Sequence, residues 1–271
     1  MYKIFITVRN RLAITKKCLE ALRLHSKIPH QIYIYDNQTN HNLAGHFNYY
    51  YKLLNKGIVA QVTFNTATST FNAFSKASAC NAFGAQHQQD PGKNDIMFLV
   101  FLDNDIIVTP GFDKAIRAAW KEVKRYKLHN VKVIGQRPGG IKHGQKLTQK
   151  IAGSDSILGK LGGSGLWSVK NNFFDDVGFL PLRELKNRQK GHDQTYWRLL
   201  AQSTGGQRYI LGLGKKLGIH CGRLTGSICN ALTRNRHKDI TFENQNKKID
   251  SMKFPEFYEM IRKRKELHND W

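Results

Sequence analysis

The sequence has few cysteines, few acidic residues and no long apolar segment. Its 271 residues include four cysteines, and no two of them form a Cys-x-x-Cys motif. We therefore expect reduced cysteines in an intracellular protein, and no zinc site. No apolar run approaches the roughly 18 residues of a membrane-spanning helix, so we expect a soluble globular protein. A strand pattern begins directly after Met1, which predicts a cytoplasmic protein without a signal peptide, in the host cytoplasm if it is viral.

The scarcity of acids leaves a large excess of positive charge. Lys and Arg number 43 against 20 Asp and Glu, which gives a formal net charge of +23 at pH 7. Within residues 120–150, nine basic residues stand against a single acid, Glu122. Such an excess attracts polyanions, so nucleic acid, an anionic membrane surface and an anionic polymer such as a glycan are the candidate partners. The simpler alternative is a charged face that is merely solvated.

The first 110 residues alternate between strand patterns and helix patterns. The patterns predict strands over 2–8, 31–35, 58–64 and from 98 onward, and helices after residue 11 and over 42–54 and 71–88. This alternation is typical of βαβ units, which build a parallel sheet flanked by helices. Binding sites in such sheets lie at the carboxyl ends of the strands.

The second half of the chain mixes strands, helices and a long loop. We expect helices from about 111 to 127 and over 195–202, and strands over 131–135, 161–169, 208–213 and 217–221. Residues 136–159 are rich in glycine and basic residues and lack periodicity, so they predict a loop or a mobile flap. The chain after residue 225 is polar.

A pair of aspartates ends the apolar run Phe98–Leu102. A continuous apolar run suits a strand that is buried on both faces of a parallel sheet. Asp103 and Asp105 would lie on the same side of the strand, where two carboxylates repel each other unless a cation lies between them. Hard oxygen ligands favour Mg²⁺ or Mn²⁺, commonly shared with a substrate diphosphate. The alternative is an Asp-Asn-Asp turn that follows the strand.

Several further motifs occur in a definite order along residues 2–225. They are Thr7-Val8-Arg9-Asn10-Arg11, Asp36-Asn37, Ala77-Ser78-Ala79-Cys80-Asn81, Leu102-Asp103-Asn104-Asp105, Gly162-Gly163-Ser164-Gly165, Asp176-Val177-Gly178-Phe179, His192-Asp193 and His220. As an ordered set they resemble the GT-A glycosyltransferases, especially the family-2 group of nucleotide-sugar-dependent enzymes.

The resemblance implies a Rossmann-like α/β fold, in which a mainly parallel central sheet is flanked by helices and a mixed subregion lies on the acceptor side. It implies one catalytic domain over 1–225, with a nucleotide-sugar-binding half over 1–109 and an acceptor half over 110–225. Residues 226–271 would form a polar C-terminal extension.

The resemblance also assigns roles on the donor side. Thr7 and Arg9 would line the nucleoside pocket, and Asp36 would accept a hydrogen bond from the base. Asp103 would hold the ribose or the metal, and Asp105 would ligate the Mn²⁺ or Mg²⁺ that bridges the diphosphate of the donor, with a UDP-sugar favoured. His220 would complete the metal shell, although a lone histidine is commonly structural. Asn81 and Lys76 would contact the donor, since Cys80 stands where the family commonly has an arginine and Lys76 lies one turn earlier.

On the acceptor side, Asp193 matches the general base of inverting members of the family. A carboxylate near a sugar hydroxyl helps by accepting its proton, but an aspartate before a helix is also an ordinary N-cap. The family usually has an acid where this chain has His192. We assign acceptor binding to Gly163, Trp167, His192, Lys142 and Lys146, with a buried core role as the alternative for Trp167.

The nature of the acceptor is left open between two classes. The charge slightly favours nucleic acid, such as a hydroxymethylated base in viral DNA, because neutralised phosphates add salt-sensitive affinity. The alternative is a cell-surface glycan or a lipid-linked sugar. A non-catalytic nucleic-acid-binding protein is the hypothesis from another class. A nucleotidyltransferase would need a glycine-rich loop after the first strand, which Thr7-Val8-Arg9-Asn10 does not provide.

Overall fold

The computed structural model describes residues 1–37, 39, 42–65, 76–136, 157–159, 165–179, 210–213, 217–221 and 247–267. The helix expected over 195–202 lies outside these residues. Within them, none of the helices combines the length and the apolar character that crossing a bilayer would require.

The first half of the chain alternates strands and helices, as the sequence predicts. The elements are β1 (Tyr2–Val8), α1 (Leu12–His25), β2 (His30–Asn37), α2 (Leu43–Asn55), β3 (Gln61–Asn65), α3 (Lys76–Gln89), η1 (Lys93–Asp95), β4 (Phe98–Asp103) and β5 (Ile106–Val108). The third strand begins later than expected. The amides of Ile58 and Val59 both donate to the Leu53 carbonyl, so these residues close the end of α2 instead.

The second half contributes α4 (Phe112–Arg125), β6 (Val133–Gln136), β7 (Ile157–Gly159), β8 (Leu166–Lys170), α5 (Phe173–Val177), β9 (Ile210–Leu213), β10 (Gly218–His220) and α9 (Phe254–Leu267). The loop expected over 136–159 is wrong at its end, because β7 pairs antiparallel with β9 and Leu158 is buried opposite Leu211. Three residues carry too little periodicity for a strand to be recognised from sequence.

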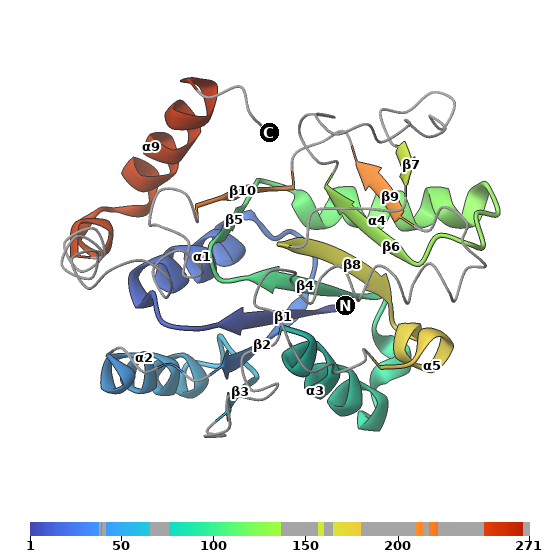
Figure 1. Cartoon of the computed structure of the whole chain (residues 1–271), viewed down its shortest axis with the longest axis horizontal. Coiled ribbons are helices and arrows are strands. Elements are labelled where there is room, and N and C mark those ends of the chain that lie inside the picture. Colours follow the sequence, from blue (N-terminus) through green and yellow to red (C-terminus); the bar gives the residue numbers. More distant parts are fainter. Residues whose placement is uncertain are drawn as a thin grey trace, which may run out of the picture.

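Among the described residues, the central sheet has eight strands in the order β3-β2-β1-β4-β8-β6-β9-β7 (Figure 1). Strands β3, β2, β1 and β4 are parallel, β8 is antiparallel to both β4 and β6, and β6 and β9 are again parallel. A separate antiparallel pair joins β5 to β10. The sheet is therefore parallel in the first half and mixed in the second.

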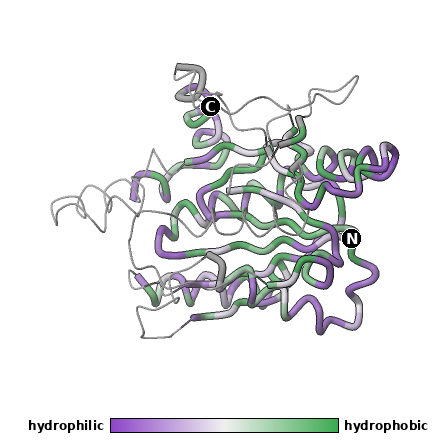
Figure 2. The backbone as a smooth tube through the Cα atoms, turned by 45° about the vertical axis from the view of Figure 1, so that its right-hand side comes forward, coloured by the Kyte–Doolittle hydropathy of each residue, from purple (hydrophilic) through white to green (hydrophobic). Residues whose placement is uncertain are grey.

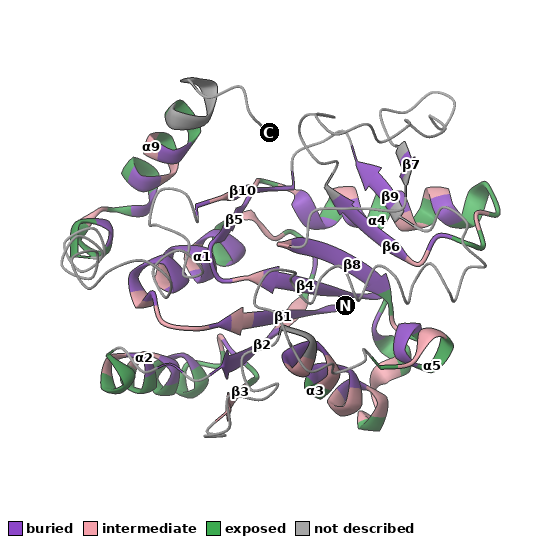
Figure 3. Cartoon of the chain, in the orientation of Figure 1, coloured by how far each residue is buried: buried purple, intermediate pink, exposed green. Residues whose placement is uncertain are grey.

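Apolar side chains form two clusters on the two faces of the sheet. Successive strand residues point to opposite faces, so Ile4 and Ile6 enter the larger cluster whereas Phe5 enters the smaller, aromatic one. Helices α1, α2, α4 and α9 contribute to the larger cluster, and α3 and α5 to the smaller one. Hydrophobic residues run along the central strands (Figure 2), and the outer faces of α2 and α4 remain exposed (Figure 3).

The segment 226–271, which we expect to be a polar extension, includes a helix that packs into the core. Helix α9 buries Phe254, Phe257 and Ile261 in the larger cluster, beside α1. Lys16 on α1 pairs with Asp250 at 2.8 Å, just ahead of α9. The spacing of the buried residues, three and then four positions apart, is that of one helical face. This face belongs to the core of the domain.

Candidate functional site

The candidate site lies at the carboxyl ends of β1, β2 and β4. In the parallel register, Thr7 lies beside both Asp103 and Tyr35, and Val8 lies beside Asp36. Three residues that the resemblance assigns to donor binding, Thr7, Asp36 and Asp103, therefore lie at the ends of neighbouring strands at the same edge of the sheet. Thr7 and Asp103 face one side of the sheet and Asp36 faces the other. This edge is where ligands bind in open α/β sheets.

A strained turn follows β1 at this edge. Asn10 and Arg11 both have left-handed backbone conformations, with φ of 55° and 59°. Each costs roughly 1–2 kcal/mol for a residue other than glycine, so the surrounding structure must hold the turn. The amide of Asn10 donates to Thr39 Oγ1 at 3.0 Å, and the Arg11 carbonyl accepts from the amide of Thr15 at 3.0 Å. The turn directs the Arg11 side chain toward Asp105, which follows β4.

Asp105 is contacted by Arg11, His220 and Cys221. Arg11 Nη1 donates to Asp105 Oδ2 at 2.9 Å, and His220 Nε2 lies 3.5 Å from the same oxygen. The main-chain oxygen of Asp105 accepts from the amide of Cys221 at 2.7 Å. The pairing of β5 with β10 places His220 beside Ile106 and so explains how residues far apart in sequence meet.

The negative charge of Asp105 also affects the pKa of a buried cysteine in the core, Cys18. Burial, followed by the charge of Asp105, raises the pKa of the Cys18 thiol well above its usual value. Cys18 therefore stays a neutral thiol, and it is not a candidate nucleophile.

The chain around Asp103 is shaped by a neighbouring glycine. The amide of Asp103 donates to the Gly165 carbonyl at 2.9 Å. A Cβ atom at Gly165 would lie 2.8 Å from Ile106 Cδ1 and 3.6 Å from Asp103 Oδ2. A side chain there would displace Ile106 and would come into van der Waals contact with the carboxylate. Asn104, between the two aspartates, donates to Thr15 Oγ1 at 2.9 Å and ties the turn to α1.

Asp36 is buried and hydrogen-bonded within the protein. Its Oδ1 accepts from the amide of Thr39 at 2.9 Å, and its Oδ2 accepts from the Tyr50 hydroxyl at 3.4 Å. Burial, and then the charge of Asp36, raise the pKa of Tyr50, so the phenol stays protonated and donates. These bonds fix the end of β2. Each carboxylate oxygen can accept more than one hydrogen bond, so the predicted contact of Asp36 with a base is compatible with them and remains a prediction.

The remaining predicted residues fall into three groups. Arg9 is partly exposed after β1, and Lys76 and Asn81 lie in the first turns of α3, where Cys80 is buried in the aromatic cluster. Trp167 is 3% exposed and stacks on Phe101 with ring centroids 4.1 Å apart, which favours the core role over acceptor binding. The remaining acceptor-side candidates lie outside the described residues: Gly163, His192, Asp193, Lys142 and Lys146.

Sequence reasoning missed Arg11 as a site residue. It stands in the quoted motif Arg9-Asn10-Arg11, but only Arg9 received a role. The available signal was the break between a strand and a helix, where a basic side chain can turn toward the next strand end. The contact of Arg11 with Asp105 could not be seen in the sequence, because the direction of the Arg11 side chain depends on the left-handed turn.

A divalent ion fits this site with two protein ligands. Asp105 Oδ2 and His220 Nε2 lie 3.5 Å apart, and carboxylate oxygen and imidazole nitrogen are both suitable donors to Mn²⁺. The described residues contain no group of three or more Asp, Glu, His or Cys that could hold a metal. Such an ion would take its remaining ligands from a diphosphate and water, as Mg²⁺ often does. Arg11 places a further positive charge at the same oxygen.

Comparison with solved structures identifies the fold. Similar structures include GalNAc-T7 with UDP, GalNAc and Mn²⁺, with a TM-score of 0.55, 12% identity, and coverage of 79% of this chain and 42% of that one. TarS from S. aureus has a TM-score of 0.51 and 14% identity, over 80% of this chain and 36% of that one. The mannosyltransferase PcManGT from Pyrobaculum calidifontis, in complex with GDP-Man and Mn²⁺, has a TM-score of 0.50 and 11% identity, over 79% and 55%.

The likeness confirms the predicted α/β architecture as a GT-A fold with a mainly parallel central sheet. These neighbours are GT-A glycosyltransferases. The chain spans less than two thirds of the length of each of them. Neither the comparison with protein-family models nor the comparison with curated proteins gives a match.

Proposed function

We propose that the protein is a glycosyltransferase that moves a sugar from a nucleotide-sugar donor to an acceptor hydroxyl. The observation that carries the proposal is that Thr7, Asp36 and Asp103 lie at the carboxyl ends of neighbouring strands of a GT-A sheet. Beside this edge, Asp105 and His220 form a pair of donors suited to a divalent ion. The neighbours that contain UDP or GDP-Man with Mn²⁺ support the same donor class.

In this proposal the donor lies across the ends of β1, β2 and β4. Thr7 and Arg9 line the nucleoside pocket, Asp36 accepts from the base, and Asp103 holds the ribose or the metal. Gly165 keeps the space beside Asp103 open, because any side chain there would approach the carboxylate. Lys76 and Asn81 contact the donor from α3, and a UDP-sugar is the favoured donor.

The leaving diphosphate gains negative charge as the sugar departs. Asp105 and His220 would hold a divalent ion, which would supply positive charge to stabilise the leaving diphosphate. Arg11 fixes Asp105 through its 2.9 Å hydrogen bond and adds a cation that is positioned before the donor arrives. A group that is already oriented in this way has no reorganisation to undergo during the reaction.

On the acceptor side, we propose that Asp193 is the general base of an inverting transfer. Its carboxylate would accept the proton of the acceptor hydroxyl while the hydroxyl oxygen attacks the sugar. Gly163, Trp167, His192, Lys142 and Lys146 remain the proposed acceptor-binding residues, of which Trp167 is the weakest because its ring is buried. The charge of +23 favours a nucleic-acid acceptor, such as a hydroxymethylated base, over a glycan or a lipid-linked sugar.

The test is a donor-hydrolysis screen over UDP- and GDP-sugars, with Mn²⁺ or Mg²⁺ and with or without modified DNA. We expect hydrolysis of one donor class, loss of activity with EDTA, and recovery when the metal is added back. Asp105→Asn should lower turnover by about 100-fold or more, as the loss of one transition-state contact commonly does. Calorimetry should show weakened binding of the nucleoside diphosphate with Mn²⁺.

Asp95→Asn provides the matched control. Asp95 is exposed and precedes β4, whereas Asp105 follows the same strand, so the two variants remove one carboxylate from opposite ends of it. Asp95→Asn should keep wild-type turnover. Near-normal turnover in a folded Asp105→Asn variant would overturn the assignment of the site.

A further inference from the structure

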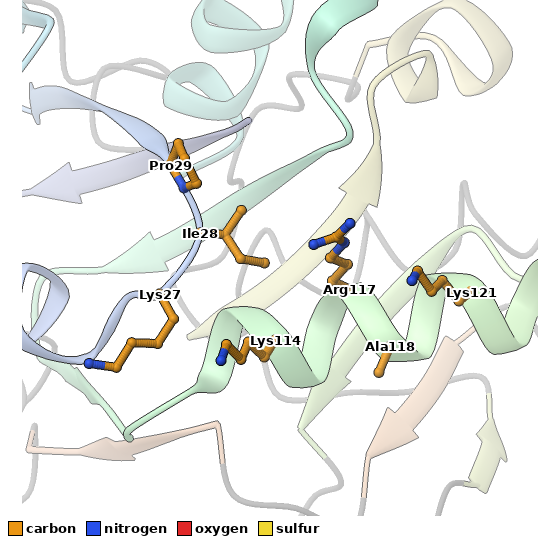
Figure 4. Close-up of a pocket in the computed structure, with 7 residues that line it drawn as sticks. All are labelled: Lys27, Ile28, Pro29, Lys114, Arg117, Ala118 and Lys121. Atoms are coloured by element: carbon orange, nitrogen blue, oxygen red, sulfur yellow. The ribbon is translucent and has the colours of Figure 1, made fainter.

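A pocket of about 320 Å³ lies between helix α4 and the loop that leads into β2. Its charged lining consists of Lys27, Lys114, Arg117 and Lys121, and its apolar lining of Ile28, Pro29 and Ala118. Figure 4 shows the three cations of α4 along one stretch of that helix, with Lys27 on the neighbouring loop. We call it the cationic pocket. None of the described residues that line it carries a carboxylate.

Among the described residues, the four cations have no acidic partner. Within the described part of the chain, no carboxylate forms an ion pair with any of them. Lys27 Nζ reaches only a main-chain oxygen, that of Leu24, at 3.5 Å. Like charges that line one pocket repel each other, and a bound anion would relieve that repulsion.

The walls of the cationic pocket are fixed from the inside by Asp113. This fully buried carboxylate accepts from the amides of Lys27 at 2.5 Å and Ile28 at 2.7 Å through Oδ2, and from the amide of Lys114 at 2.8 Å through Oδ1. The loop and the first turn of α4 are therefore joined by one side chain. A pocket whose walls are already in place needs little ordering of its backbone when a ligand binds.

The cationic pocket is separate from the candidate donor site. Pro29 accepts a hydrogen bond from the amide of Tyr2 at 3.1 Å, which places the loop at the amino end of β1. The donor site lies beyond Val8 at the other end of the same strand. Six residues of strand separate the two ends by about 20 Å. A ligand in the pocket would not occupy the donor site.

We propose that the cationic pocket binds the phosphate backbone of a nucleic acid. The row of cations continues beyond the pocket, because Lys124 and Arg125 are also exposed on α4. From Lys114 to Lys124 the helix extends for about 15 Å, a length that suits a polymer better than a single phosphate. The lining residues that the structure describes include no aromatic side chain on which a base could stack, so the contact is with phosphates and independent of base sequence.

A lipid surface is less suited to the cationic pocket. Helices that lie on membranes insert large apolar side chains, whereas Ile28 is 8% exposed and Ala118 is small. An exposed apolar row lies on α2 instead, where Leu43, Phe47 and Tyr51 are each more than half exposed. Figure 1 shows α2 at the lower left of the molecule and α4 at the right, well apart from each other.

The experiment measures binding of the full chain to a labelled, mixed-sequence duplex of about 20 base pairs by fluorescence anisotropy, from 50 to 200 mM NaCl. The triple variant Lys114→Gln, Arg117→Gln, Lys121→Gln should bind at least 10-fold more weakly at 50 mM. Each lost phosphate contact removes about 0.7–0.9 from the slope of log K against log salt, so the slope should become shallower by about 2 to 3. Ala118→Glu should weaken binding without removing any cation.

A matched triple variant, Lys52→Gln, Lys56→Gln, Lys263→Gln, removes the same charge from exposed positions on or next to other helices. It should bind the duplex nearly as well as the wild type, and both triple variants should keep the wild-type circular dichroism spectrum. Equal weakening by the two triple variants would overturn the proposal, because it would reduce the effect to net charge. Pocket-dependent binding to phosphatidylserine vesicles, without binding to the duplex, would also overturn it.

The proposal goes beyond sugar transfer and is tested without a donor. Asp105→Asn should bind the duplex as the wild type does, because Asp105 is at the other edge of the sheet. Pocket-dependent binding of the duplex without donor hydrolysis would support the proposal for the cationic pocket and overturn the proposed glycosyltransferase activity. Donor hydrolysis without pocket-dependent binding would do the reverse.

Discussion

At the scale of single residues, the candidate site depends on an arginine that shares its aspartate with a histidine. Arg11 and Asp105 are 3% and 12% exposed in their side chains, so their ion pair is largely removed from water. A pair of this kind adds little stability by itself, but removing one partner leaves an unpaired charge in a poorly solvated place. The pair therefore fixes the position of Asp105 more than it stabilises the fold.

A second buried cation, Lys3, carries a prediction about pH. Lys3 lies in the middle of the sheet with a side chain 2% exposed, and its ammonium donates to Asp90 at the end of α3. This hydrogen bond lowers the pKa of Asp90 below its ordinary value of 3.8. A carboxylate with a lowered pKa contributes stability above about pH 4, and this contribution is lost as the pH falls through the lowered pKa.

We expect Asp90→Asn to lower the free energy of unfolding by about 2 kcal/mol at pH 7, because Lys3 loses its partner while Asp90 is only partly buried. The difference between variant and wild type should be constant from pH 7 to 5 and should shrink below about pH 4. Urea unfolding at each pH measures it. The exposed Asp95→Asn is the control and should change stability by less than about 0.5 kcal/mol. A difference that grows toward low pH would contradict this account.

At the scale of elements, the sequence predicts those strands and helices that have a clear local periodicity of apolar residues. Strand β4 and the two aspartates at its end are evident because an apolar run stops at charged residues. The order of strands and helices in the first half follows from similar patterns. The arginine that contacts Asp105 could not be predicted. Arg11 reaches it only through two left-handed residues, and such a conformation depends on tertiary contacts with Thr39 and Thr15.

Helix α9 could not be recognised from the sequence for a different reason. Its buried residues Phe254, Phe257 and Ile261 are spread among charged residues, so the segment looks polar on average. Only the helical face reveals it, and that face could not be distinguished from isolated apolar residues without its contact with α1. Average composition conceals a narrow apolar stripe.

The packing of α9 gives a prediction about stability. Phe257 is 1% exposed in the larger cluster. Phe257→Ala should lower the free energy of unfolding by about 3–5 kcal/mol, since it leaves a cavity where a buried ring was. Lys263→Ala, at an exposed position of the same helix, should change it by less than about 0.5 kcal/mol. Urea unfolding measures both, and equal small effects would mean that α9 is not part of the core.

At the scale of the whole molecule, the net charge of +23 acts on stability and binding in opposite directions. Repulsion among excess cations destabilises the compact state, and salt screens it, with a Debye length of about 10 Å at 0.1 M. We therefore expect the free energy of unfolding to rise by on the order of 1 kcal/mol between 50 and 300 mM NaCl, the scale of a few surface charge pairs. Over the same range, affinity for duplex DNA should fall.

The Lys114, Arg117, Lys121 triple variant tests whether repulsion among the cations of α4 causes the salt dependence of stability. It removes three clustered cations that have no acidic partner among the described residues, so its stability at low salt should exceed that of the wild type and should rise less with NaCl. Sodium chloride is the right salt, because sulfate also strengthens apolar burial. A stability that falls with NaCl in the wild type would mean that attractive ion pairs, rather than the unpaired cations of α4, dominate the electrostatics of the fold.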